Sequence, residues 1–297
     1  MPVELPFDPN LVPQLLKEGR MKVVTSPSVV VTPGERPIQT DQMVERAKDI
    51  LGKDFLGVEA VRTMQNTIRA IDIDGKKPFA NLEFQLDQLS TFPYTEQDLL
   101  LAKQNGEMVV LRAESMYTGN IGSFNSSGIT VSSGIELISI INFRELFRKD
   151  PVGSLSTVFY SFKSGANDWY KSQDFATKPG EIQLGWSIVK KELLNGSTSK
   201  NWQNQEALLK VYATDLSKKG AQNTQVRRRT ATEAVWDELL YYTNNKEQLL
   251  PAVVDWTSSR ASDGDLVYVG NFDSDGLRVD HWGPDGARSR LGVVPSR

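Results

Sequence analysis

Carboxylates and one histidine near the C-terminus are the side chains of this 297-residue chain whose types and spacing suit metal binding or acid–base chemistry. Asp273-Ser274-Asp275-Gly276 places two carboxylates at alternating positions, as at the start of a calcium-binding loop. The complete loop also requires a closing glutamate, and no glutamate occurs after Glu247. We therefore predict a tight turn at these residues and no metal ligands.

His281 is the single histidine, and it stands between Asp280 and Trp282 in an expected strand. A general base needs an oriented partner. The neighbouring sequence supplies no specific one, which favours a surface histidine. Cysteine is absent, so disulfides, thiolate metal sites and cysteine nucleophiles are excluded, and we expect any metal site to consist entirely of oxygen ligands. The composition therefore favours a protein that is not an enzyme and has no cofactor.

Basic residues do not gather into a surface for nucleic acid. The formal net charge is −3, whereas phosphate binding needs a concentrated positive surface. Three arginines, Arg227–Arg229, precede a predicted helix, where cations oppose the helix dipole. We expect them to form tertiary ion pairs, and we expect no nucleic-acid partner.

Targeting signals are also not evident. No apolar run approaches the ~18–20 residues that span a bilayer. The first residues, MPVELPFDPNLVPQLL, lack a basic start followed by an apolar block. We expect no membrane span, and a cytoplasmic location is the default expectation.

The elements that must position these side chains begin with a small mixed helical region. Residues 1–40 contain seven of the fourteen prolines, and proline fixes φ and donates no hydrogen bond, which predicts an extended arm. Apolar spacing then predicts helices beginning near Thr40 and near Gly57, and a short helix over 93–104. We assign residues 1–106 to an N-terminal region of unknown role.

Residues 107–297 are predicted to be α+β, with strands from Glu107 onward. Two longer helices are expected, one from about residue 202 and one from Thr230 to Tyr242. Thr230 and Glu233 form a capping box, in which hydroxyl and carboxylate each bind a free backbone amide. The apolar stripe of the first of these helices is expected to be Ala207, Leu208, Val211, Tyr212 and Leu216.

The last 45 residues read as short strands and turns. LVYVGNF (266–272) and GLRVDHW (276–282) flank the predicted turn, which is typical of a hairpin because Gly and Asp tolerate positive φ. LGVVPSR (291–297) is predicted to be one final strand.

One compositional feature sets this region apart. Lys, Glu, Gln and Met total 56 of the 297 residues, yet none of the four occurs in residues 249–297. Charge persists there as Asp and Arg, so the region does not avoid polar residues.

Two explanations of this composition are possible. Short polar groups, arginine and tyrosine suit an adaptable recognition surface. The absence of these four residue types can also be explained at the level of codons. AAC or AAT codons mutated at adenines yield Asp, Ser, Gly, Arg, Tyr or His and never Lys, Glu, Gln or Met.

Two stretches carry a resemblance to a known family. RRRTATEAVWDELLYYTNNKEQLLP (227–251) is similar to an Arg-Leu-Pro-Thr-x-x-Glu helix start, matching at Thr230, Glu233 and Trp236 and departing at Arg228 and Arg229. The ending from residue 256 contains a Trp, a strand-Gly-x-Phe, an Asp-Gly-x-x-Val-x-x-Trp and a Leu-Gly-Val-Val. With a less specific match from residue 181, the chain resembles the variable proteins of diversity-generating retroelements.

The resemblance implies a C-type-lectin fold of the formylglycine-generating-enzyme type over residues 107–297. In that family an error-prone reverse transcriptase rewrites the C-terminal region at template adenines, here about residues 256–290. The main chain stays fixed while exposed side chains vary, and the variable surface binds a ligand, most often a protein. The resemblance thus implies a non-catalytic ligand-binding protein.

Strand alternation divides the C-terminal residues into scaffold and exposed sets. The expected scaffold is Val267, Val269, Phe272, Leu277, Val279, Trp282, Val293 and Val294. The expected exposed, ligand-binding residues are Ser262, Asp263, Asp265, Tyr268, Asn271, Asp273, Arg278, Asp280, His281, Asp285, Arg288 and Arg290.

Two other function classes stay open. An oxidase of the formylglycine-generating type shares the implied fold, but its chemistry depends on cysteines, which are absent. A calcium-dependent sugar lectin would carry Glu-Pro-Asn and Trp-Asn-Asp patterns, which this sequence lacks. The identity of the ligand and the oligomeric state are not indicated by the sequence.

Overall fold

The fold is described by a computed structural model in which Gln39–Arg297 form one compact unit. The described residues are 38–69, 92–117, 135–147, 153, 155, 157–160, 169–178 and 180–297. The predicted proline-rich arm, residues 1–40, lies almost entirely outside this set, as do residues 118–134 of the predicted strands. The architecture of the compact unit is α+β, with two mixed sheets and several helices.

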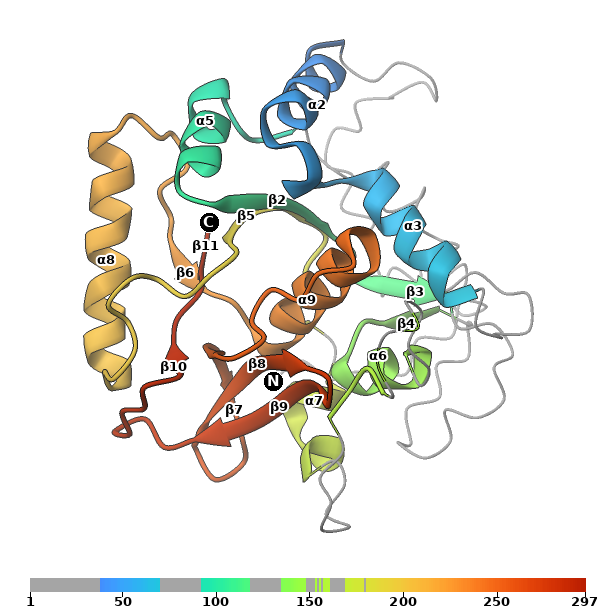
Figure 1. Ribbon diagram of the computed structural model, residues 1–297, viewed down its shortest axis with the longest axis vertical. Helices are drawn as coiled ribbons and strands as arrows, with labels where there is room; N and C mark the ends of the chain where they lie inside the picture. The colour runs from blue at the N-terminus through green and yellow to red at the C-terminus, as the bar shows by residue number, and fades with distance from the viewer. Residues whose placement is uncertain are drawn as a thin grey trace, which may run out of the picture. The chain divides into compact units, whose positions relative to one another are not determined.

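The first sheet has five strands in the order β1-β2-β5-β11-β6 (Figure 1). β1 runs parallel to β2, and the other pairs are antiparallel. The strands are β1 (Phe55–Leu56), β2 (Glu107–Arg112), β5 (Gly185–Lys190), β6 (Arg227–Arg228) and β11 (Pro295–Ser296). Because β1 pairs with β2, the predicted boundary between residues 106 and 107 falls inside this compact unit.

The second sheet has four strands in the order β10-β7-β8-β9. β10 is parallel to β7, while β7, β8 and β9 form an antiparallel meander. The strands are β7 (Val254–Arg260), β8 (Leu266–Asp273), β9 (Gly276–Trp282) and β10 (Leu291–Gly292). The predicted hairpin with its turn at Asp273–Gly276 is confirmed by the pairing of β8 with β9. A separate two-stranded sheet pairs β3 (Ser115–Tyr117) with β4 (Ile135–Leu137).

Helix α9 (Ala231–Asn245) lies between the two larger sheets and contacts β2, β7 and β8 (Figure 1). Every residue from Ala231 to Thr243 is buried. The predicted capping box is confirmed, because the Thr230 hydroxyl accepts from the amide of Glu233 and the Glu233 carboxylate accepts from the amide of Thr230. This helix is therefore the centre of the core.

The other helices that the structure describes surround α9 and the two larger sheets (Figure 1). They are α2 (Ile38–Leu51), α3 (Val58–Arg69), α5 (Glu96–Gln104), α6 (Ile140–Leu146), α7 (Asp174–Thr177) and α8 (Trp202–Lys218), with 3₁₀ turns η1 (Gly52–Asp54) and η3 (Trp169–Ser172). The helices predicted near Thr40, near Gly57 and over 93–104 correspond to α2, α3 and α5. Ala47, Ile50 and Leu51 of α2 are buried.

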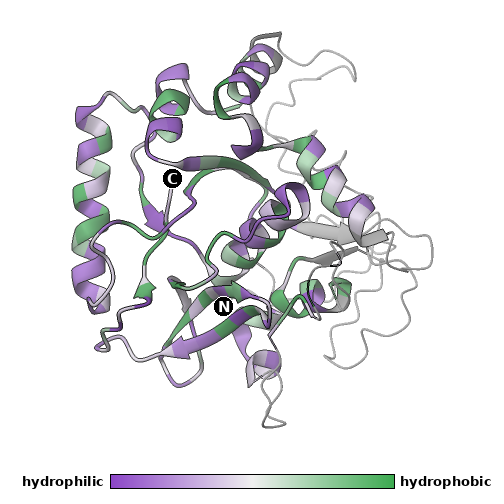
Figure 2. Cartoon of the chain, in the orientation of Figure 1, coloured by the Kyte–Doolittle hydropathy of each residue, from purple (hydrophilic) through white to green (hydrophobic). Residues whose placement is uncertain are grey.

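The predicted apolar stripe of α8 is wrong in part. Val211 is 65% exposed and Ala207 is also exposed, whereas Gln205, Leu209 and Leu216 are buried. Much of the ribbon of α8 is hydrophilic in Figure 2. The inward face instead includes a polar residue, because Gln205 donates to the carbonyl oxygen of Ser197 at 3.0 Å.

The C-terminal segment is also different from the prediction of one final strand. Residues 291–297 form two short strands in two different sheets, β10 beside β7 and β11 between β5 and β6. Val293 and Val294, between them, are fully buried as predicted. The segment therefore ties the two sheets together.

A network of buried ion pairs joins α9 to both sheets. Arg112 of β2 donates to both carboxylate oxygens of Asp237 (3.0 and 2.7 Å) and to Glu233 (2.8 Å). Arg229 donates to Asp237 (3.0 Å) and to Asp255 of β7 (2.9 and 3.0 Å). All five side chains are buried. Burial disfavours the ionised form of Glu233, yet Arg112 and further hydrogen bonds outweigh it and lower its pKa to about 2.

The predicted tertiary pairing of the three arginines is thereby confirmed. Arg227 pairs with Glu233 at 2.6 Å and Arg228 pairs with Glu206 of α8, while Arg229 is held as described above. The guanidinium of Arg228 also lies over the ring of Trp202, 3.5 Å from its centroid. These contacts account for the arginine run as part of the scaffold.

Replacing Arg229 with Met should lower the free energy of unfolding by about 3–5 kcal/mol, because two buried carboxylates lose a partner. Urea denaturation followed by circular dichroism measures this change. The matched control is Lys178→Met, which breaks an exposed pair with Asp174 and should change stability by less than about 1 kcal/mol. Equal effects of the two substitutions would contradict the structural role of the network.

Glu238, also on α9, should make stability depend on pH. It is fully buried, and this burial raises its pKa from 4.5 to about 8. The folded state therefore binds more protons than the unfolded state between these values, so stability falls as pH rises from 4.5 to 8. Glu238→Gln should remove about 2–4 kcal/mol of this decline between pH 5 and pH 8.

Urea denaturation of the wild type and Glu238→Gln at pH 5, 6.5 and 8 measures the difference in slope. Glu59→Gln is the control, because Glu59 is exposed on α3, with 72% of its side chain accessible. The Glu59 variant should keep the wild-type slope. Parallel pH profiles for wild type and Glu238→Gln would show that Glu238 does not titrate in this range.

Candidate ligand-binding face

The antiparallel hairpin of β8 and β9 has one face against the core and one facing outward. Val267, Val269, Leu277 and Val279 are buried in the main core cluster, which also contains residues of α9. Side chains that alternate with them point to the opposite side of the sheet. We call this side the outer face, and on these strands it carries Tyr268, Arg278, Asp280 and Trp282.

Part of the outer face is covered by the scaffold. Trp256 of β7 and Leu266 of β8 are buried there with Leu291, and Trp202 of α8 packs against them. The rings of Trp202 and Trp256 meet edge to face at 5.7 Å. The open part of the outer face is therefore the side formed by β9 and the neighbouring positions of β8.

The polar and aromatic groups of the open part contact one another. Tyr268 donates its hydroxyl to Asp280 at 3.2 Å, across the strand pair. Burial, followed by the charge of Asp280, raises the pKa of Tyr268. The guanidinium of Arg278 lies 4.2 Å from the ring centroid of Tyr160. Tyr268 therefore presents a neutral hydroxyl beside a carboxylate and a guanidinium.

Trp282 ends β9 and is 36% exposed. Arg288 lies over its indole ring, 4.0 Å from the centroid. A shallow depression of about 520 Å³ opens beside it, lined by Asp265, Trp282 and residues 283–286. Gly286 is needed at this place, because a Cβ there would come within 2.0 Å of Nε1 of Trp282. An aromatic ring with a stacked arginine thus borders a concave surface.

Main-chain hydrogen bonds hold the loop of residues 283–290 to the scaffold. In each bond a loop carbonyl oxygen accepts from a scaffold amide. One amide precedes α8, one belongs to α8 and one belongs to β7. The three bonds are Trp202 N to Pro284 O (3.1 Å), Ser199 N to Arg288 O (2.8 Å) and Val254 N to Arg290 O (2.8 Å). The loop path therefore does not depend on the side chains of Asp285, Arg288 and Arg290, which are exposed.

None of the twelve residues predicted to be exposed is buried. Ser262, Asp263, Asp285, Arg288 and Arg290 are exposed. The half-buried ones are Asp265, Tyr268, Asn271, Asp273, Arg278, Asp280 and His281.

The twelve do not form one cluster. Asn271 and Asp273 lie at the far end of the hairpin from Asp265, where they shape the tight turn. Asn271 has φ +44° and donates its side-chain amide to Asp273, whose other oxygen accepts from the amide of Asp275. This is the turn that the sequence predicted at these residues. Its groups satisfy one another and are separate from the outer face around Trp282.

The predicted orientations of His281 and Trp282 are wrong. Trp282, predicted to belong to the scaffold, is exposed, whereas His281, predicted to be exposed, lies on the core side of β9, in phase with Val279. The ring of His281 packs against Trp169, with 4.3 Å between the ring centroids. Regular alternation from Val279 gives this assignment, because residues 279 and 281 share one face and residues 280 and 282 the other.

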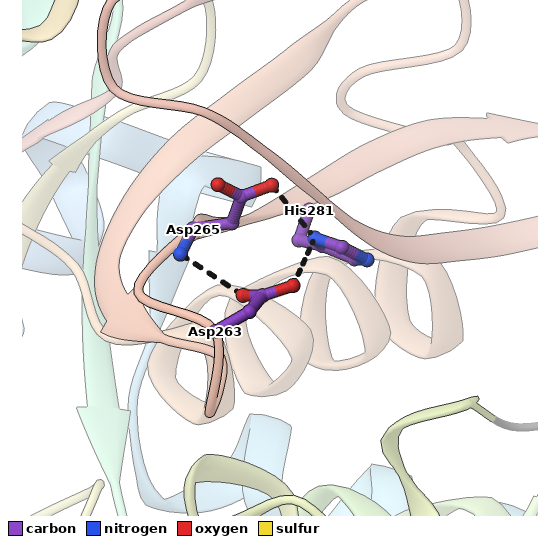
Figure 3. Close-up of side chains that lie close together, drawn as sticks. All are labelled: Asp263, Asp265 and His281. Atoms are coloured by element: carbon purple, nitrogen blue, oxygen red, sulfur yellow. Dashed lines mark hydrogen bonds and ion pairs between the residues drawn. The ribbon is translucent and has the colours of Figure 1, made fainter.

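His281 also has charged partners that the sequence did not indicate. Figure 3 shows Asp263 and Asp265, from the turn before β8, pointing toward its imidazole. Nδ1 of His281 lies 3.1 Å from Oδ2 of Asp265 and 3.8 Å from Oδ2 of Asp263. These three are a group of ligand-type side chains close enough to share a metal ion. Antiparallel pairing of Val267 with His281 brings them together.

Comparison with known proteins finds no matching family model, no matching curated protein and no matching solved structure. Among the described residues, no helix is long and apolar enough to cross a membrane.

The division between outer face and scaffold can be tested by stability measurements. Combining Asp285→Ala, Arg288→Ala and Arg290→Ala should change the free energy of unfolding by less than about 1 kcal/mol, because all three side chains are exposed and the contact of Arg288 with Trp282 lies at the surface. Leu277→Ala, at a side chain only 1% exposed, should cost about 2–5 kcal/mol. Unfolding of the triple variant under conditions where the wild type is folded would contradict the division.

Proposed function

We propose that this chain is a non-catalytic ligand-binding protein of the kind diversified by a retroelement. Its C-terminal residues would adopt a C-type-lectin fold of the formylglycine-generating-enzyme type, with side chains of residues 256–290 contacting the ligand. The observation that carries the proposal is the separation of roles in this region. Main-chain bonds and a buried core face fix the path of the chain, while the side chains of Asp285, Arg288 and Arg290 are exposed on it.

The chemistry of the open outer face supports a protein ligand. Interface energy concentrates in aromatic and arginine side chains, and the face offers Tyr268, Trp282, Arg278 and Arg288. The face is shallow, which suits another protein surface better than an enclosed small molecule. Tyr268 and Arg288 are therefore the anchors on which we expect affinity to depend.

Trp282 has a particular place in this proposal. The tryptophan codon TGG contains no adenine, so mutagenesis at template adenines would leave a codon for Trp282 unchanged. Its neighbours Asp280, Asp285 and Arg288 are all types that AAC or AAT codons mutated at adenines yield. We therefore propose a constant indole surrounded by variable polar groups.

The oxidase and the sugar-lectin alternatives have less support. The oxidase chemistry depends on cysteines, which the sequence does not contain. A sugar lectin would bind through calcium and carboxylates at fixed positions, whereas the turn at Asp273–Gly276 uses its carboxylate for its own backbone.

The DNA around the gene provides the decisive test. We expect a near-copy of the sequence encoding residues 256–290, beside a reverse-transcriptase gene, with mismatches only where the copy has adenine. Codons for the outer-face side chains other than Trp282 should carry the mismatches, and codons for Val267, Val269 and Val279 should not. The absence of such a copy, or mismatches spread over all four bases, would contradict the proposal.

A further inference from the structure

Asp263, Asp265 and His281 combine two carboxylates with the single imidazole of the chain at one end of the β8–β9 hairpin. We propose that this cluster binds one divalent transition-metal ion, with Zn²⁺ as the representative ion. The proposal concerns metal binding alone and does not rest on the proposed function.

The distances fit a single ion with little movement. Zinc binds imidazole nitrogen and carboxylate oxygen at about 2.0–2.2 Å, which separates neighbouring ligand atoms by about 3.4 Å in a tetrahedral site. Nδ1 of His281 is 3.1 Å from Oδ2 of Asp265 and 3.8 Å from Oδ2 of Asp263. The ligand atoms all lie within 4.8 Å of one another. Asp263 makes the remaining adjustment most easily, because its side chain is 58% exposed.

The donor types select the class of metal. Ca²⁺ and Mg²⁺ prefer sites made entirely of oxygen. Imidazole suits zinc and other late transition metals, and carboxylates complete their sites. Two carboxylates also supply a charge of −2, which matches a divalent cation.

The turn between β7 and β8 holds the carboxylates in place. Oδ1 of Asp263 accepts from the amide of Asp265 at 3.0 Å, which leaves Oδ2 turned toward His281 (Figure 3). Gly264 has φ +92°, a conformation that favours glycine, and its carbonyl oxygen accepts from Arg260 at 2.9 Å. The ligand carboxylates are thus presented by a defined backbone.

The imidazole is also held in place. Its ring packs on Trp169, whose indole nitrogen donates to the carbonyl oxygen of Val279 at 3.1 Å. This packing keeps Nδ1 toward the carboxylates.

A protein site with three ligands leaves at least one coordination position open. Asp265 lines the depression beside Trp282, so the cluster adjoins a concave surface from which water or an external donor group can reach the metal. A carboxylate or imidazole of a ligand is the chemistry that would occupy this position.

The single histidine makes the test unambiguous. Full-length ¹⁵N-labelled protein without an affinity tag is stripped of metal with a chelator, titrated with Zn²⁺, and followed through the imidazole ¹⁵N resonances. We expect saturation at one Zn²⁺ per chain, with the large shift at Nδ1 of His281. Ca²⁺ and Mg²⁺ at the same concentrations should leave the resonances in place.

Calorimetry on matched variants completes the experiment. Asp263→Asn keeps the oxygen that accepts from Asp265 while removing the charge, and it should weaken Zn²⁺ binding at least tenfold. Asp275→Asn removes one exposed carboxylate from the opposite turn and should leave the affinity unchanged. Unchanged imidazole resonances, a shift at Nε2 alone, or equal affinities of the two variants would overturn the proposal.

Discussion

Buried guanidinium–carboxylate contacts around the start of α9 are the interaction on which the rest of this structure depends. Taking these charges out of water is costly, and close pairing with several hydrogen bonds is what makes it possible. Arg112 belongs to the five-stranded sheet and Asp255 to the four-stranded sheet, while Asp237 on α9 accepts from both Arg112 and Arg229. The network therefore sets the position of the helix relative to both sheets.

The C-terminal segment is held by the same network of buried charges that positions α9. Asp255 uses its second oxygen to accept from the amide of Val294 at 2.7 Å, so the carboxylate that holds Arg229 also holds the segment between β10 and β11. Arg297 then pairs with Glu107 of β2 at 2.9 Å. Asp255 pairs with Val269, which faces the core, so the contacts of Asp255 do not involve the open part of the outer face. A ligand-binding role for that face is compatible with this arrangement.

The features that the sequence predicted correctly are those formed by residues close together in the chain. The capping box at Thr230 and Glu233 depends on residues three apart, and the turn at Asp273–Gly276 depends on four consecutive residues, so both could be predicted. The arginine run could be interpreted as paired because cations are unfavourable at a helix start. The partners Asp255 and Glu206 could not be named, since pairing across distant segments leaves no pattern in one sequence. The lectin-type fold, the retroelement and the ligand remain predictions.

The sequence predicted which residues of the candidate site are polar and exposed better than it predicted how their side chains are oriented and which of them meet. The exposed character of Arg288 and Arg290 follows from polarity and a turn-rich segment. Polarity predicts an outward His281 and an inward Trp282, whereas strict alternation along β9 gives the opposite orientations, which are the ones observed. The meeting of Asp263, Asp265 and His281 depends on the register of β8 against β9, which no local pattern specifies.

The main-chain hydrogen bonds of residues 283–290 limit the sequence changes that this loop can accept during evolution. Three carbonyl oxygens, at Pro284, Arg288 and Arg290, meet amides at separate places on the scaffold. One inserted or deleted residue would move at least one carbonyl away from its amide, whereas a substitution leaves all three in place. Replacement at constant length is therefore the route of divergence that this loop permits, and relatives should differ there in residue type while keeping the same spacing.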